Sequence, residues 1–147
     1  MTTNPNVRSL SRALLLAALA LSSAASAADM VVIKNSKVDT AKLSKSDLKE
    51  MLTGKTKFWK NGKSVQVVLG GEGTPESAWV AGFVFGVGES AMITKMKQET
   101  FKGELKKVVS CTGDDECAAG VKANEGGLGV VSAAAKLPAG VVVVEVN

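Results

Sequence analysis

The residues with the clearest chemical potential lie between Gly70 and Ser77, in the sequence GGEGTPES. Thr74, Pro75 and Glu76 are typical of a helix start, with a capping side chain, a proline in the first turn and an acid near the positive end of the helix dipole. The N–H groups of a glycine-rich loop and of a helix N-terminus favour a bound anion. The residues that we expect to contact a small anion or another polar solute are Gly71, Gly73, Thr74 and Ser77.

A second group of polar residues follows the first apolar segment, residues 30–33. Asn35 and Ser36 come soon after it, and open α/β sheets place ligands at the carboxyl ends of their strands. We expect Asn35 and Ser36 to contribute to the same cleft as the glycine-rich loop. The alternative is that both are ordinary polar loop residues.

The glycine-rich loop also has a purely structural explanation. Gly70–Thr74 can be a tight strand-to-helix connection, in which Thr74 is a helix cap and Ser77 supports the first turn. Histidine chemistry is excluded because the chain contains no His. The sequence has no G-x-S-x-G elbow, no Walker motif and no spaced acidic metal loop. It therefore favours a binding protein that is not an enzyme, and it offers no catalytic, cofactor or metal site.

The first 27 residues have the pattern of a secretory signal peptide. Arg8 and Arg12 precede the apolar run 13–21, and residues 25–27 (Ala-Ser-Ala) provide a cleavage site. We expect cleavage after Ala27, a periplasmic or secreted product, and one domain over residues 28–147. The apolar run is shorter than the roughly 20 residues that span a bilayer, so we expect no membrane anchor.

The charge of the exported chain differs from that of the whole sequence. Both arginines leave with the signal peptide, so 16 lysines face 14 acidic residues and the net charge is +2. No arginine or tyrosine remains, and no basic run is interleaved with aromatic residues. A nucleic-acid partner is therefore not expected.

Cys111 and Cys117 are the only cysteines. In an oxidising compartment, two cysteines this close most simply form one structural disulfide. A redox-active pair in an exported thiol–disulfide enzyme is the alternative. The segment CTGDDEC, however, lacks the C-x-x-C spacing of such enzymes, and a reduction potential below about −300 mV would exclude this role.

Apolar segments alternate with segments of helical periodicity along the chain. We expect strands at 30–33, 65–69, 108–109, 128–131 and 141–146, and helices that begin near Ser44, Thr74, Ser90 and Asp114. Nearly continuous apolar strands between helices are typical of an α/β domain with a mostly parallel sheet flanked by helices. The same reasoning makes residues 30–33 a buried parallel strand.

Four segments in order resemble the phosphate-type substrate-binding proteins of ABC transporters, which are type 2 periplasmic binding proteins. They are residues 43–68 (LSKSDLKEMLTGKTKFWKNGKSVQVV), 70–85 (GGEGTPESAWVAGFVF), 100–103 (TFKG) and 125–131 (EGGLGVV). The second segment stands where the family has a glycine-serine-glycine-threonine loop. The resemblance implies one lobe of such a protein, without enzyme activity, in ABC-type phosphate transport. It also implies a partner lobe, a homodimer or a transporter subunit that completes the cleft.

Two departures from the family pattern concern the ligand. Glu72 stands where the family has a serine, and the family's phosphate-contacting arginine has no counterpart. A carboxylate beside an anion repels it, so the identity of the ligand stays open. The alternative is a protein-interaction module that has kept the fold and lost its ligand, with an exposed apolar patch near Phe58 and Trp59.

Overall fold

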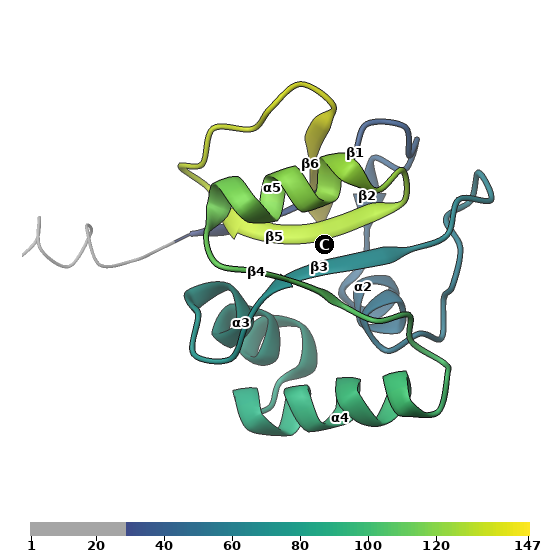
Figure 1. Cartoon of the computed structure of the whole chain (residues 1–147), viewed down its shortest axis with the longest axis vertical. Helices are drawn as coiled ribbons and strands as arrows, with labels where there is room; N and C mark the ends of the chain where they lie inside the picture. Colours follow the sequence, from purple (N-terminus) through teal and green to yellow (C-terminus); the bar gives the residue numbers. More distant parts are fainter. Residues whose placement is uncertain (1–28) are drawn as a thin grey trace, which may run out of the picture.

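The computed structural model describes residues 29–147, and the expected signal peptide lies outside the described residues. Six strands form one sheet in the order β2-β6-β1-β5-β3-β4 (Figure 1). The strands are β1 (Met30–Asn35), β2 (Lys42–Leu43), β3 (Gln66–Gly70), β4 (Val109–Cys111), β5 (Gly127–Ser132) and β6 (Val141–Val146). The helices are α2 (Lys45–Leu52), α3 (Pro75–Val80), α4 (Glu89–Phe101) and α5 (Asp114–Ala123), and a π-helical segment, η1 (Ala81–Phe85), extends α3.

Helices cover both faces of this sheet, as Figure 1 shows. Successive side chains of a strand point to opposite faces, so Val67 and Leu69 of β3 enter one hydrophobic core and Val68 enters another. The larger core packs the sheet against α2, α3, η1 and α4. The smaller core packs it against α5. The expected α/β sheet flanked by helices is therefore confirmed.

The direction of β1 differs from the prediction. β3 runs parallel to β4 and β5, and β2 runs parallel to β6, but β1 is antiparallel to both of its neighbours, β5 and β6. A short run of β-branched residues indicates burial and not direction, so the prediction of a parallel strand at residues 30–33 was wrong. The rest of the sheet shares one direction, as expected of a mostly parallel sheet.

The helix starts follow the capping signals of the sequence. Ser44 caps α2 in a capping box with Asp47. Thr74 caps α3, and its Oγ1 accepts the Ser77 N–H. α4 is the exception: it begins at Glu89, one residue before the expected Ser90, and Gly88 stands at its N-cap without a capping side chain.

Phe58 lies at the surface, whereas Trp59 lies in the core. Trp59 is buried, and its Nε1–H donates to the Gly126 carbonyl oxygen at 2.9 Å. Phe58 is 60% exposed. The expected apolar patch therefore contains Phe58 but not Trp59.

Within residues 29–147, no helix on its own has the length and apolar character needed to cross a membrane. Two segments, Pro75–Phe85 and Glu89–Phe101, meet these criteria only when taken together, and they meet at an angle of 83°.

Cys111 and Cys117 form the expected disulfide, which joins the end of β4 to α5. Both residues are buried in the smaller core. Buried cysteines in apolar surroundings are typical of structural bridges and not of reactive thiols.

We predict that reduction of this disulfide lowers the free energy of unfolding by about 2–2.5 kcal/mol, because the closed ring restricts the unfolded chain. Urea unfolding with and without a reductant measures the difference. The variant with both Cys111→Ala and Cys117→Ala is the control, since the reductant should not change its stability. Equal stability of the oxidised and reduced wild-type protein would contradict the prediction.

Candidate functional site

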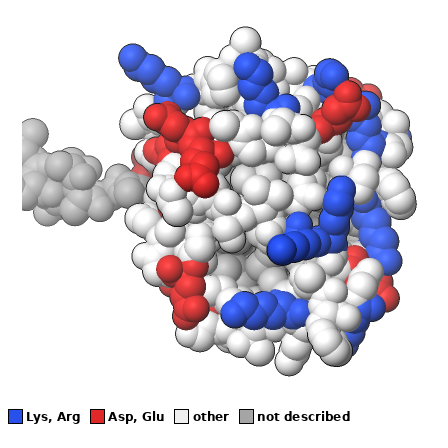
Figure 2. All heavy atoms as spheres, in the orientation of Figure 1, with Lys and Arg blue, Asp and Glu red and all other residues white. Residues whose placement is uncertain are grey.

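A pocket of about 530 Å³ lies beside the loop that follows β3. This volume is in the range of small-molecule sites, about 300–1,000 Å³. The surface drawn in Figure 2 is hollowed near its centre, beside lysine side chains, and acidic side chains lie at several places around it. The pocket is lined by Leu69, Gly70, Gly71, Glu72, Ser77, Ile93, Met96, Lys97, Thr100, Phe101, Lys107, Val108 and Ser110.

The loop beside this pocket depends on its glycines. A Cβ at Gly70 would lie 2.5 Å from Thr74 Oγ1, so only glycine lets the chain turn this closely into α3. Gly73 has a φ of +87°, a conformation that side chains rarely adopt. The sequence GGEGT thus produces a turn that places Thr74 over the end of β3.

Several polar groups of the loop already have partners within the chain. The Gly73 N–H donates to Glu89 Oε1 at 2.6 Å. The Thr74 N–H and hydroxyl both donate to the Gly71 carbonyl oxygen, at 3.2 and 2.8 Å. The loop therefore holds a carboxylate of its own chain, and a solute that uses the Gly73 N–H must displace Glu89.

Ser77 is the predicted residue with an unused polar group inside the pocket wall. It is 1% exposed, and its Oγ has no hydrogen-bond partner among the described residues. A buried hydroxyl without a partner is uncommon because it loses its water and gains nothing in return. Ser77 is one of the residues that line the pocket.

Two lysines also line the pocket. Lys97 comes from α4, and Lys107 lies in the segment before β4. Neither forms an ion pair with another described residue. The Glu72 carboxylate lines the same pocket and opposes a bound anion.

The sequence analysis did not identify the α4 side of this pocket. Ile93, Met96, Lys97 and Thr100 recur at i, i+3, i+4 and i+7, so they share one face of α4. Met92 and Met96 are buried in the larger core, and Ile93 and Met96 also line the pocket. The spacing of these four residues was the sequence signal that could have identified this face of α4.

The structure does not bring Asn35 and Ser36 to this pocket, and the expectation that they share its cleft was wrong. Asn35 pairs with Val141 of β6, and the preceding residue Lys34 pairs with Leu128 near the start of β5. Since β5 and β3 are parallel, the end of β1 lies at the edge where β3 begins, whereas the loop follows the end of β3. The antiparallel direction of β1 is the reason.

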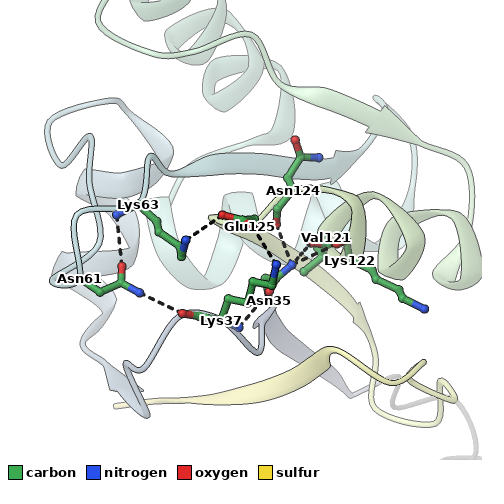
Figure 3. A network of polar contacts seen from close by, with 8 residues as sticks. All are labelled: Asn35, Lys37, Asn61, Lys63, Val121, Lys122, Asn124 and Glu125. Carbon is green, nitrogen blue, oxygen red and sulfur yellow. Dashed lines mark hydrogen bonds and ion pairs between the residues drawn. The ribbon is translucent and has the colours of Figure 1, made fainter.

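Asn35 instead satisfies the last carbonyl groups of α5, as Figure 3 shows. It is 4% exposed, and its Nδ2 lies 2.9–3.1 Å from the carbonyl oxygens of Val121, Lys122 and Asn124. Its Oδ1 accepts the Lys37 N–H at 2.9 Å. The last carbonyl groups of a helix lack the regular i to i−4 partner. The Val121 and Asn124 carbonyl oxygens also accept the backbone N–H groups of Asn124 and Gly127. Asn35 therefore adds donors that cap the end of α5, and it has no amide N–H left for a solute.

We predict that Asn35→Ala lowers the free energy of unfolding by about 1–3 kcal/mol, because buried carbonyl groups lose their donor. Ser36→Ala is the control, since Ser36 is exposed and should change stability little. Urea unfolding of both variants measures the difference. An Asn35→Ala protein as stable as the Ser36→Ala protein would contradict the capping role.

Glu125 lies beside Asn35 and joins two segments of the chain (Figure 3). Its carboxylate pairs with Lys37 and Lys63, each at 2.7 Å. The hydrogen bonds from Lys37 and Lys63 and their positive charges lower the pKa of Glu125 from 4.5 to about 2. Both ion pairs of Glu125 are accessible to solvent, so salt should weaken them.

We predict a pH dependence from this group. A pKa that is lower in the folded protein means that Glu125 stabilises the fold above about pH 4.5 and that this contribution disappears as the pH falls to about 2. The difference in melting temperature between the wild-type protein and Glu125→Gln should therefore shrink over that interval. High salt should reduce the difference at neutral pH. A difference that is constant over this pH range would contradict the prediction.

Within residues 29–147, no group of three or more Cys, Asp or Glu residues is arranged to hold a metal ion. The candidate site is the pocket beside β3, which is lined by Ser77, two lysines, the Glu72 side chain and an apolar wall.

No protein-family model matches the chain, and no curated protein matches its sequence. Solved structures do match it. They include a phosphate-binding protein from Stenotrophomonas maltophilia (20% identity, TM-score 0.57) and an ABC-type phosphate transport receptor from Vibrio cholerae (12%, 0.54). PstS from Borrelia burgdorferi is a third (11%, 0.57).

These matches cover 81–82% of this chain. The chain spans only 39–47% of the length of the three proteins. At this level of identity the likeness concerns the fold. Residues 29–147 therefore have the α/β fold of one part of a phosphate-type substrate-binding protein, as the sequence resemblance implied.

Proposed function

We propose that residues 28–147 form an exported domain of the solute-binding type, which holds a small anion or polar solute in the pocket beside β3. The fold neighbours are substrate-binding proteins, which supports a binding role and not an enzymatic one. The proposal includes ABC-type transport and a partner lobe, second copy or transporter subunit that completes the cleft. Export rests on the expected signal peptide.

The buried hydroxyl of Ser77 is the observation that carries this proposal. Ser77 Oγ is enclosed, lacks a partner among the described residues, and belongs to the wall of a pocket large enough for a small molecule. A buried polar group without a partner is uncommon in folded proteins, and an ordered water, an ion or a functional role can account for it. Gly71 lines the same pocket, which supports the proposal that Gly71 and Ser77 contact the solute.

Gly73 and Thr74, the other two predicted contact residues, already form hydrogen bonds within the chain. The Gly73 N–H would bind the solute after Glu89 moves away, and Thr74 would hold the shape of the loop through its bonds to Gly71 and Ser77. The carboxylates of Glu72 and Glu89 disfavour a doubly charged anion here. The proposal therefore names an anion or polar solute and leaves phosphate as one case to test.

We predict that calorimetric titration with phosphate, sulfate and small or larger organic acids gives binding to at least one of them, and that Ser77→Ala weakens it about tenfold through the lost hydrogen bond. Ser36→Ala is the matched control because Ser36 lies at the opposite edge of the sheet. Ser77→Ala should leave the melting temperature unchanged or slightly higher, since it removes an unpaired buried hydroxyl. Binding to none of these compounds, or equal affinity of the two variants, would contradict the proposal.

A protein-interaction module of the same fold is the second candidate. Phe58 is 60% exposed and Phe101 is 95% exposed, and Glu89 already holds the Gly73 N–H. Exposed aromatic side chains are common at protein interfaces. If this function is correct, no small solute binds in the calorimetric titration. A protein partner binds instead, and Phe58→Ala or Phe101→Ala abolishes its binding.

A further inference from the structure

The composition of the pocket wall narrows the class of ligand. Leu69, Ile93, Met96 and Val108 line it from β3, α4 and the segment before β4. An inorganic oxyanion placed against such a wall would lose hydration without compensating hydrogen bonds. An apolar body, in contrast, gains free energy when this wall removes it from water.

The polar groups of the pocket fit an acidic head. Ser77 Oγ donates or accepts one hydrogen bond, and the ammonium groups of Lys97 and Lys107 donate to a carboxylate. Neither lysine has a competing ion pair among the described residues. Lysine stems can also lie along apolar surface while the amine reaches the head group.

The charge of the head group decides whether the pocket favours a carboxylate or a phosphate. Glu72 is part of the pocket lining, and its repulsion grows with the charge of the ligand. Phosphate groups carry about −1.5 to −2 near neutral pH, whereas a monocarboxylate carries a single negative charge. The pocket therefore disfavours the more highly charged head.

Phe101 adds apolar surface at the rim of the pocket. It lines the pocket at the end of α4, yet it is 95% exposed. A phenyl ring this exposed has no partner on its own surface and is free to contact the body of a bound molecule. The rim and the wall of the pocket therefore both offer apolar surface to a ligand.

Resting on the proposed function, we infer that the pocket binds an amphiphilic organic anion, a monocarboxylate with an apolar body. The body lies against Leu69, Ile93, Met96 and Phe101, and the carboxylate contacts Ser77, Lys97 and Lys107. This assignment makes inorganic phosphate a poor ligand of this chain.

The test is a titration of the protein with acetate, butanoate, hexanoate and octanoate, with inorganic phosphate and hexanol as comparisons. Affinity should rise about threefold to fourfold with each added methylene group, from roughly 0.8 kcal/mol per buried CH₂. Hexanoate should bind at least tenfold more tightly than hexanol or phosphate. Phe101→Ala should reduce the gain per methylene without affecting the fold, because its side chain is exposed.

The lysines provide the matched variants. Lys97→Gln and Lys107→Gln should weaken hexanoate binding and leave hexanol binding unchanged. Lys122→Gln, at the opposite edge of the sheet, should change neither. Hexanoate affinity that is equal in all three variants would overturn the assignment of the head group.

The outcomes separate this inference from the function on which it rests. If phosphate or acetate binds in a Ser77-dependent way and longer carboxylates bind no more tightly, the inference is wrong and the solute-binding proposal stands. If no compound binds, both are wrong. If affinity rises with chain length but Ser77→Ala has no effect, the Ser77-based solute-binding proposal and the assignment of the head group are both wrong.

Discussion

Strand β3 connects the two hydrophobic cores and ends at the pocket. All five of its residues are buried, with Val67 and Leu69 in the larger core and Val68 in the smaller. Since neighbouring side chains point to opposite faces, β3 cannot shift by one residue without exchanging these two sets. The end of β3 is therefore firmly placed, and the glycine-rich loop begins there.

The loop is built around a close contact that only glycine permits. Thr74 lies over Gly70 and caps α3, and the π-helical segment η1 continues that helix toward α4. Glu89 at the start of α4 then reaches back to the Gly73 N–H. The loop thus binds one carboxylate of its own chain, and the adjoining pocket has an apolar wall with Ser77 among its lining residues.

The edge of the sheet where β1 ends, away from the pocket, has a structural role. Asn35 holds the end of α5, and Glu125 joins Lys37 to Lys63 across the same region (Figure 3). These polar residues fix the C-terminal end of α5, the helix that covers the smaller core. Polar residues that follow a strand can therefore serve either a ligand or a helix terminus, and the direction of the strand decides between the two.

The sequence by itself determined most of the elements, the caps at Ser44 and Thr74, the disulfide and the α/β class, because these depend on local periodicity, capping chemistry and nearby cysteines. It did not indicate the short strand β2 or the π-helical segment η1. Gly71 and Ser77, which it predicted as contact residues, line the pocket. Only the tertiary structure decided that β1 runs antiparallel, that Asn35 caps α5, that Glu89 occupies the Gly73 N–H, and that Lys97 and Lys107 line one pocket. The physical reason is that strand direction and contacts between distant segments follow from how the sheet is assembled, which a local pattern of residues does not record.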